Sequence, residues 1–227
     1  LGHGQWHVEG VGSNGLRPPS QALDFGNSGT GARLMLGVVA GYPIEARFVG
    51  DQSLSRRPMG RVLDPLQDMG ATYSANAGQT FPLTLFGRDD LKAITYAPPH
   101  ASAQIKSCLL LAGLNAHGTT KVHEARLTRD HSERMLRGFG VHVSSEVEGP
   151  ANRVSIEGGQ AWHAQEVIVP GDPSSAAFLA AAAMISPRGG VLIEGLMSNQ
   201  TRDGFYRAAA LMGAPVGAED VGTAAGE

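Results

Sequence analysis

The stretch LDFGNSGTGARLMLGVVA, residues 23–40, decides how the rest of the chain is arranged. A short apolar run breaks into a loop of small residues at 26–31, and a helix that is apolar on nearly every side follows. The first backbone N–H groups of a helix lack partners within the helix, so an anion can approach them closely. The stretch therefore predicts an anion-binding site at the start of this helix. The alternative is a helix capped by Ser28 or Thr30, with glycines that serve only tight packing.

Composition excludes several classes of function. The 227 residues carry a formal net charge of −3 and no basic stripe with interleaved aromatic residues, which argues against nucleic acid as a partner. No apolar stretch is long enough to span a membrane. The opening residues LGHGQWHVEG lack both an initiator methionine and the pattern of a secretion signal. We expect a cytoplasmic protein that has been cut from a longer one.

The residue types that usually bind metals or form disulfides are sparse. Cys108 is the single cysteine, so no internal disulfide is possible, and its apolar surroundings predict a buried structural thiol rather than a nucleophile. The eight histidines form no pair at metal-ligand spacing. We expect no metal.

The pattern that begins at residue 23 returns twice. Each copy reads strand, small-residue loop, apolar helix, strand, polar helix, and glycine stop, and the stops at Gly70, Gly140 and Gly213 lie about 70 residues apart. The apolar helices are expected at 34–40, 107–114 and 176–185, and the polar ones at 57–69, 129–137 and 202–211. Pro65 should bend or shorten the helix at 57–69. The strands are expected at 45–49, 71–75, 81–86, 94–96, 119–123, 141–145, 153–157, 167–169 and 190–194, with residues 6–11 as the last strand of a preceding unit.

This repetition predicts an α/β fold of βαβαββ units around buried parallel helices, an incomplete inverse α/β barrel. Helices that are apolar all round must be enclosed. If they are parallel, the partial positive charges of their N-termini add where the loops at Asn27, Ser102 and Ser174 meet. A polyanionic ligand would fit there.

Five segments then resemble one family, 5-enolpyruvylshikimate-3-phosphate (EPSP) synthase of the bacterial type with RPMGR and TRDH motifs. They are GNSGTGAR (26–33), GDQSLSRRPMGRVLDPL (50–66), ASAQIKSCLLLAGL (101–114), TRDHSERML (128–136) and PGDPSSAAFLAAA (170–182). The resemblance implies a transferase of the shikimate pathway, in aromatic amino acid biosynthesis. Such a transferase moves the enolpyruvyl group of phosphoenolpyruvate to the 5-hydroxyl of shikimate 3-phosphate without metal or organic cofactor.

The resemblance also implies how the chain is divided. The family has two similar domains of three units each, and this chain matches the middle of that pattern. Residues 1–165 would be a substrate-binding domain, with the end of one unit and two full units, and residues 166–227 the truncated first unit of the second domain. The family's lysine-bearing PGDKS motif and its catalytic aspartate and glutamate have no match here. The segment PGDPSS (170–175) is similar to that motif, but Pro173 stands where the motif has lysine. We therefore assign no catalytic residue to this chain and expect little turnover from it.

On the phosphoenolpyruvate side, the resemblance implies roles for Arg57 and for the loop residues Asn27, Gly29 and Thr30. A guanidinium suits phosphate and carboxylate because its fork donates two parallel hydrogen bonds; a structural salt bridge is the alternative for Arg57. Gly29 occupies the position where glycine leaves room for the inhibitor glyphosate and alanine crowds it. A glyphosate-sensitive enzyme is implied.

On the shikimate 3-phosphate side, the matching residues are Ser102, Ala103 and Gln104, with Gln104 touching both substrates. A simple helix cap is the alternative for this loop. Arg129 would balance a substrate anion, or else pair locally with Asp130 or Glu133. Thr128 matches the same segment and could cap the helix that follows.

Two rival functions stay open at this point. The UDP-N-acetylglucosamine enolpyruvyl transferase shares the fold and the donor, but it uses a loop cysteine as acid, whereas Cys108 lies on an apolar helix. A noncatalytic fragment without ligand affinity is the other. The resemblance further implies a monomer with no membrane partner.

Overall fold

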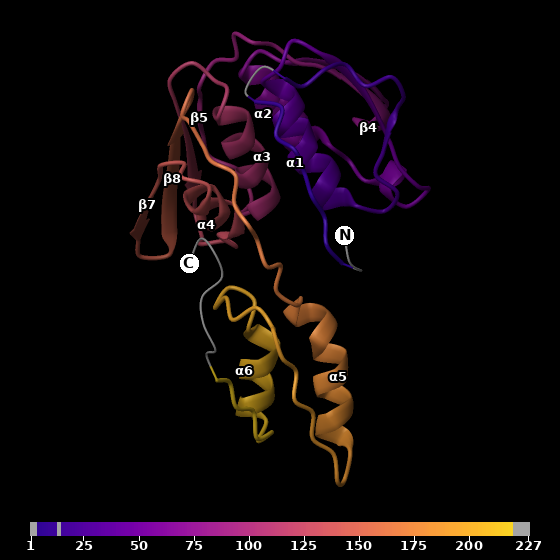
Figure 1. The fold of residues 1–227 in the computed structure, drawn as a ribbon, viewed down its shortest axis with the longest axis vertical. Coiled ribbons are helices and arrows are strands. Elements are labelled where there is room, and N and C mark those ends of the chain that lie inside the picture. Colours follow the sequence, from indigo (N-terminus) through magenta and orange to yellow (C-terminus); the bar gives the residue numbers. More distant parts are fainter. Residues whose placement is uncertain (1–3, 13–14, 220–227) are drawn as a thin grey trace. The chain divides into compact units, whose positions relative to one another are not determined.

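The computed structural model describes residues 4–12 and 15–219, and the chain divides into two compact units (Figure 1). Unit 1 comprises Leu1–Thr128 and Gly140–Ala164, and unit 2 comprises Arg129–Phe139 and Gln165–Glu227. Within the described residues no helix is both long and apolar enough to cross a bilayer.

Unit 1 holds two four-stranded sheets of the same topology. The first has the order β1-β2-β4-β3 and the second the order β5-β6-β8-β7. In each sheet the first two strands in this order are parallel and the other pairings are antiparallel. The strands are β1 (Leu23–Asp24), β2 (Glu45–Val49), β3 (Thr72–Asn76), β4 (Thr80–Phe86), β5 (Thr95–Tyr96), β6 (Thr119–Glu124), β7 (Val143–Glu148) and β8 (Ala151–Glu157). The repeat that the sequence predicted is confirmed for these two copies.

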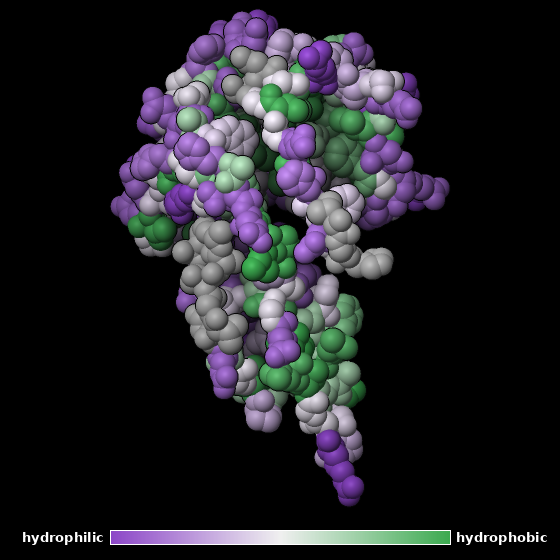
Figure 2. Space-filling view, viewed as in Figure 1, coloured by the Kyte–Doolittle hydropathy of each residue, from purple (hydrophilic) through white to green (hydrophobic). Residues whose placement is uncertain are grey.

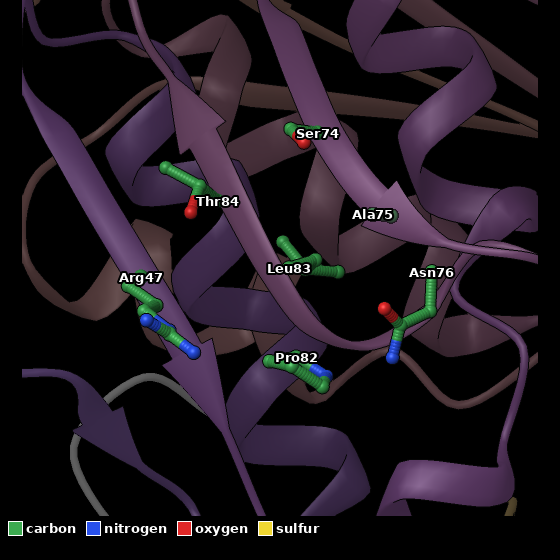
Figure 3. Close-up of a pocket in the computed structure, with 7 residues that line it drawn as sticks. All are labelled: Arg47, Ser74, Ala75, Asn76, Pro82, Leu83 and Thr84. Carbon is green, nitrogen blue, oxygen red and sulfur yellow. The ribbon is translucent and has the colours of Figure 1, made fainter.

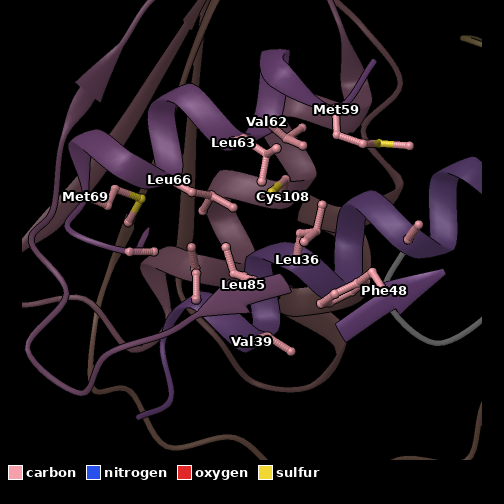
Figure 4. Close-up of a cluster of buried hydrophobic side chains, with 14 of the residues drawn as sticks. Leu36, Val39, Phe48, Met59, Val62, Leu63, Leu66, Met69, Leu85 and Cys108 are labelled. Atoms are coloured by element: carbon pink, nitrogen blue, oxygen red, sulfur yellow. The ribbon is translucent and has the colours of Figure 1, made fainter. Parts of the chain in front are cut away.

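Two of the three apolar helices are enclosed as predicted. Helices α1 (Gly29–Ala40) and α3 (Ala103–Gly113) pack side by side in unit 1. A Cβ added at Gly37 of α1 would lie 2.2 Å from the Cys108 carbonyl oxygen of α3, so the two backbones approach each other too closely for any side chain there. Apolar residues of α2 and the first sheet close the core around them (Figure 4).

Helix α2 (Gly60–Asp68) begins later than the sequence predicted. Leu54–Arg56 forms a short 3-10 turn, and Arg57 has extended backbone angles of φ −84° and ψ 126°. The reason is Pro58, because a residue that precedes proline is pushed out of the helical region. The helix does run past Pro65, whose carbonyl oxygen accepts from the Met69 N–H.

The three glycine stops are confirmed. Gly70, Gly140 and Gly213 have φ values of 114°, 88° and 90°. After Gly70 and Gly213, the next N–H turns back to the last helical turn, from Ala71 to the Leu66 oxygen and from Ala214 to the Ala209 oxygen. This is the backbone pattern that ends a helix at a left-handed residue.

Unit 2 contains α4 (His131–Gly138), α5 (Pro173–Ile185) and α6 (Gly204–Leu211). The strands expected at 167–169 and 190–194 do not form, and a single parallel bridge between Gly171 and Leu196 stands in their place. In unit 1 the strands that correspond to 190–194 are β2 and β6, and each pairs with one strand of a hairpin, β4 or β8. Residues 214–219 form no strand that could take part in such a hairpin.

Two further sequence expectations are wrong for the same reason. Residues 6–11 form no strand and are exposed, because no described strand lies beside them to supply hydrogen bonds. Helix α5 is not enclosed: Phe178 is 82% exposed and Ile185 85%, since the described residues of its own unit form no sheet that could cover it.

Candidate functional site

The start of α1 is a capped helix end with one free backbone donor. Ser28 is the N-cap, and its Oγ accepts from the Gly31 N–H at 3.2 Å. The backbone N–H of Thr30 has no acceptor among the described residues. The capping role and the anion-binding site, which the sequence presented as alternatives, are thus compatible.

Arg57 lies against this loop, as the sequence predicted. Its Nη2 donates to Asn27 Oδ1 at 3.0 Å and to Ser53 Oγ at 3.2 Å. The other end of the Asn27 amide donates to Asp51 Oδ2 at 2.7 Å. This bond, with the Leu54 N–H that donates to Asp51 Oδ1, lowers the pKa of the Asp51 carboxyl. Arg57 is therefore held in place through neutral partners.

The start of α3 meets the start of α1 through side chains. Ser102 caps α3, with its Oγ 3.5 Å from the Ile105 nitrogen, and the N–H groups of Ala103 and Gln104 have no acceptor among the described residues. Gln104 Nε2 donates to Thr30 Oγ1 at 2.7 Å. Two residues that the sequence predicted for one site, 74 positions apart, are in contact.

Arg33 and Arg61 join the cluster, and sequence reasoning gave neither of them a role. Arg33 is only 3% exposed, and its Nη1 donates to Gln104 Oε1 at 3.0 Å and to the Gly29 carbonyl oxygen at 3.2 Å. Arg61 Nη2 lies 3.4 Å from the same Gln104 oxygen. Burial, then the charges of Arg61 and Arg57, lower the pKa of Arg33 to about 10. A charged residue inside an otherwise apolar helix was the signal that could have revealed Arg33.

The three guanidinium groups are not neutralised by carboxylates. Within the described part of the chain, every hydrogen bond that Arg33, Arg57 and Arg61 donate goes to a neutral oxygen, and none of the three forms an ion pair. Arg33 is buried whereas Arg57 and Arg61 are exposed, so the cost of a buried charge that no carboxylate compensates falls on Arg33. The arrangement suits an anion.

Gly29 lies between two of these cations. A Cβ added there would lie 3.1 Å from Arg33 Nη1 and 3.2 Å from Arg57 Nη1. Alanine could be accommodated only if both groups shifted by a few tenths of an ångström, which is easier for the exposed Arg57 than for the buried Arg33. A side chain at position 29 would therefore displace the guanidinium groups of Arg33 and Arg57.

Thr128 is not the cap of α4. Its hydroxyl donates to Glu124 Oε1, which belongs to a fully buried ion pair whose Oε2 lies 2.8 Å from Lys106 Nζ. The N-cap of α4 is Asp130, and this residue pairs with Arg134 rather than with Arg129. Arg129 belongs to unit 2, and its part in the site stays a prediction.

The loop before α5 is already occupied by a carboxylate of the chain. Asp172 accepts from the N–H groups of both Ser174 and Ser175 at 3.2 Å and forms an ion pair with Arg202. Its meeting with the Asn27 and Ser102 loops, which the sequence suggested through Ser174, stays a prediction.

Other candidate sites are weaker. A shallow hollow on the first sheet has one charged side chain, Arg47, and is otherwise lined by small polar and apolar groups (Figure 3). The described residues contain no group of three or more potential metal ligands. Cys108 is buried, and burial raises the pKa of its thiol to about 12, which confirms a structural thiol and disfavours an acid role.

A sequence model of the family EPSP synthase (3-phosphoshikimate 1-carboxyvinyltransferase) matches residues 3–225. This chain belongs to that family. The 3-phosphoshikimate 1-carboxyvinyltransferase of Hyphomonas neptunium is 56% identical over 227 residues, which are 100% of this chain and 52% of that protein. The one from a Methylobacterium species is 54% identical over 95% of this chain and 49% of its own length.

Solved structures of EPSP synthase are also similar to this chain. That of the Acinetobacter baumannii enzyme superposes with a TM-score of 0.83 at 43% identity, over 96% of this chain and 48% of that one. The fold class of repeated βαβαββ units is therefore that of EPSP synthase. The chain spans about half the length of the relatives it matches.

Proposed function

We propose that this chain takes part in enolpyruvyl transfer from phosphoenolpyruvate to shikimate 3-phosphate and supplies binding surface for both. The observation that carries the proposal is the convergence of Arg33, Arg57 and Arg61 on one spot without a carboxylate partner. Both substrates are small polyanions, and guanidinium groups bind phosphate and carboxylate well. Membership of the EPSP synthase family supports the choice of these anions.

Phosphoenolpyruvate is assigned to the side of the cluster formed by Arg57, Asn27, Gly29 and Thr30. Asn27 and Ser53 hold one nitrogen of Arg57, which leaves the rest of its fork for a ligand. The absence of a side chain at Gly29 lets Arg33 and Arg57 approach this position closely, because an added Cβ would lie 3.1 Å from Arg33 Nη1 and 3.2 Å from Arg57 Nη1. An anion bound there would supply the negative charge that the chain itself does not.

Shikimate 3-phosphate is assigned to Ser102, Ala103 and Gln104, together with Thr128 and Arg129. The free N–H groups at the start of α3 are suited to phosphate oxygens. We place these residues in a substrate-binding domain of residues 1–165 and residues 166–227 in the opening unit of a second domain. The enzyme would work in the cytoplasm as a monomer.

The reaction requires a proton for the methylene carbon of phosphoenolpyruvate and a base for the 5-hydroxyl of shikimate 3-phosphate. The clustered arginines can stabilise developing negative charge, but at neutral pH they are neither acid nor base. We therefore propose that this chain binds the substrates and turns them over slowly or not at all.

Calorimetric titration of the chain with shikimate 3-phosphate, with and without phosphoenolpyruvate, tests the proposal. Arg57→Met should weaken phosphoenolpyruvate binding about 10- to 100-fold, because it removes charged hydrogen bonds. Arg47→Met is the matched control, since Arg47 is exposed on β2, and it should leave binding unchanged. Binding heat with UDP-N-acetylglucosamine instead would favour the rival transferase. If none of these ligands gives binding heat, the chain is an inert fragment.

Glyphosate should compete with phosphoenolpyruvate for the space beside Gly29. Gly29→Ala would push on Arg33 and Arg57 and should weaken glyphosate more than phosphoenolpyruvate, provided that the inhibitor fills more of that space. Competition titrations with the unmodified chain and with Gly29→Ala measure this. Equal losses for both ligands would contradict the assignment of Gly29.

A further inference from the structure

We infer that Arg33 and Arg61 are positioning residues that fix the Gln104 side-chain amide, so that Gln104 meets its ligand as a hydrogen-bond donor only. The inference rests on the proposed function and assigns to that site two residues beyond those that the sequence indicated. It begins from the hydrogen bonds of a single amide.

The oxygen of the Gln104 amide is already occupied. An sp² carbonyl oxygen has two lone pairs. Here Oε1 accepts from Arg33 Nη1 at 3.0 Å and from Arg61 Nη2 at 3.4 Å. Its Nε2 gives one N–H to Thr30 Oγ1 at 2.7 Å. One N–H is left, and it is the only part of the amide that a ligand can use.

The chemistry of the neighbours determines this orientation. If the amide were flipped, its NH₂ group would face two guanidinium groups that can only donate, and both groups would lose Gln104 as an acceptor. The three bonds are thus satisfied together only in one orientation. An amide held this way offers a donor to an incoming carboxylate or phosphate oxygen, and it cannot turn a lone pair toward the anion.

Arg33 is itself rigidly held. It is 3% exposed, its Nη1 also donates to the Gly29 oxygen at 3.2 Å, and its Nη2 lies 3.4 Å from the Pro58 oxygen. One guanidinium thus connects the start of α1, the turn before α2 and the start of α3. Arg61 is exposed and its bond is longer, so its contribution to the orientation is smaller.

A double-mutant cycle separates positioning from direct attraction of the anion. Arg33→Met should weaken binding of phosphoenolpyruvate, measured with saturating shikimate 3-phosphate, about 10-fold or more, and Arg61→Met about two- to threefold. In a Gln104→Met background each change should weaken binding by a smaller factor, because only the direct attraction between the charge and the anion then remains. Arg47→Met, on the outer face of the sheet, should have no effect in either background. If Arg33→Met or Arg61→Met weakens binding equally with and without Gln104, the charge acts on the ligand directly and the inference is wrong.

A second readout needs no ligand. In the NMR spectrum of the labelled chain, the Gln104 side-chain proton that is bonded to Thr30 should give a sharp signal and exchange slowly with solvent, whereas the free N–H should exchange faster. Arg61→Met, at an exposed position, should broaden the signal of the bonded proton and speed its exchange. If the chain binds no phosphoenolpyruvate, the proposed function fails while this measurement still decides the inference. Signals that are identical in the wild type, Arg33→Met and Arg61→Met would overturn it.

Discussion

Arg33 shows how a residue of the proposed site can lower the stability of the folded chain. Its charge is enclosed beside two further arginines, and burial is the main cause of its lowered pKa of about 10. A group of this kind disfavours its charged form in the folded state, so it costs stability below pH 10, and the cost falls as the pH rises through that value. An anion in the cluster would remove the same cost at neutral pH.

We predict that Arg33→Met separates stability from binding. Methionine fills most of the volume without the charge, but it removes the side-chain bonds to the Gly29 and Pro58 oxygens. These effects oppose each other, so the free energy of unfolding should change by less than about 1 kcal/mol while substrate binding is lost. Urea denaturation with and without phosphoenolpyruvate measures both. A loss of several kcal/mol in the unliganded chain would mean that Arg33 is mainly structural.

At the scale of elements, the contact between α1 and α3 sets the distance between the two halves of the cluster. Gly29 and Thr30 lie at the start of α1, and Gln104 lies at the start of α3. The close approach at Gly37 lets these starts share hydrogen bonds. Anything that separates the helices should therefore weaken the site.

Gly37→Ala tests this dependence. The new Cβ would lie 2.2 Å from a backbone oxygen, which cannot move without shifting α3, so we expect a loss of about 2 kcal/mol or more in stability and weaker substrate binding. Gly204→Ala is the control, because it is also a helical glycine but has nothing within 4 Å of the added carbon. Denaturation curves and titrations that are unchanged in Gly37→Ala would refute the proposed close packing.

A second link between elements is the buried pair of Lys106 on α3 and Glu124 at the end of β6. Both side chains are 0% exposed, and Glu124 also accepts from Asn152 and Thr128. Lys106→Met leaves a carboxylate buried without its cation and should cost about 3–5 kcal/mol. Arg153→Met breaks an exposed pair with Glu146 and should cost less than about 1 kcal/mol. Thermal denaturation of the two variants compares their losses of stability directly. Similar losses would show that the buried pair contributes no more to stability than the exposed pair.

At the scale of the whole molecule, the sequence predicted the repeated elements but not the features that depend on a neighbouring strand or side chain. The glycine stops and the apolar helices at 70-residue spacing predicted both sheets of unit 1, because each copy there contains all its own strands. The strands expected at 167–169 and 190–194 failed, since a strand needs hydrogen bonds from a neighbour that local pattern cannot supply. Arg61 was missed because an exposed arginine on a polar helix face is usually only solvated, and Gln104 gives it a role only in three dimensions.

The unpaired third copy leaves a large apolar surface on α5. Of its 13 residues only Pro173 and Ala176 are buried, and apolar side chains gather over this helix in the space-filling view (Figure 2). Contiguous apolar surface of this kind binds hydrophobic dyes and is a liability for aggregation. We predict that the chain enhances the fluorescence of the dye ANS and that Phe178→Ser with Ile185→Ser removes most of the enhancement. Val147→Ser, at an exposed residue of β7 in unit 1, should leave it unchanged. Weak dye binding by the unmodified chain would show that α5 is covered in solution, and sedimentation velocity would then reveal whether a second copy of the chain covers it.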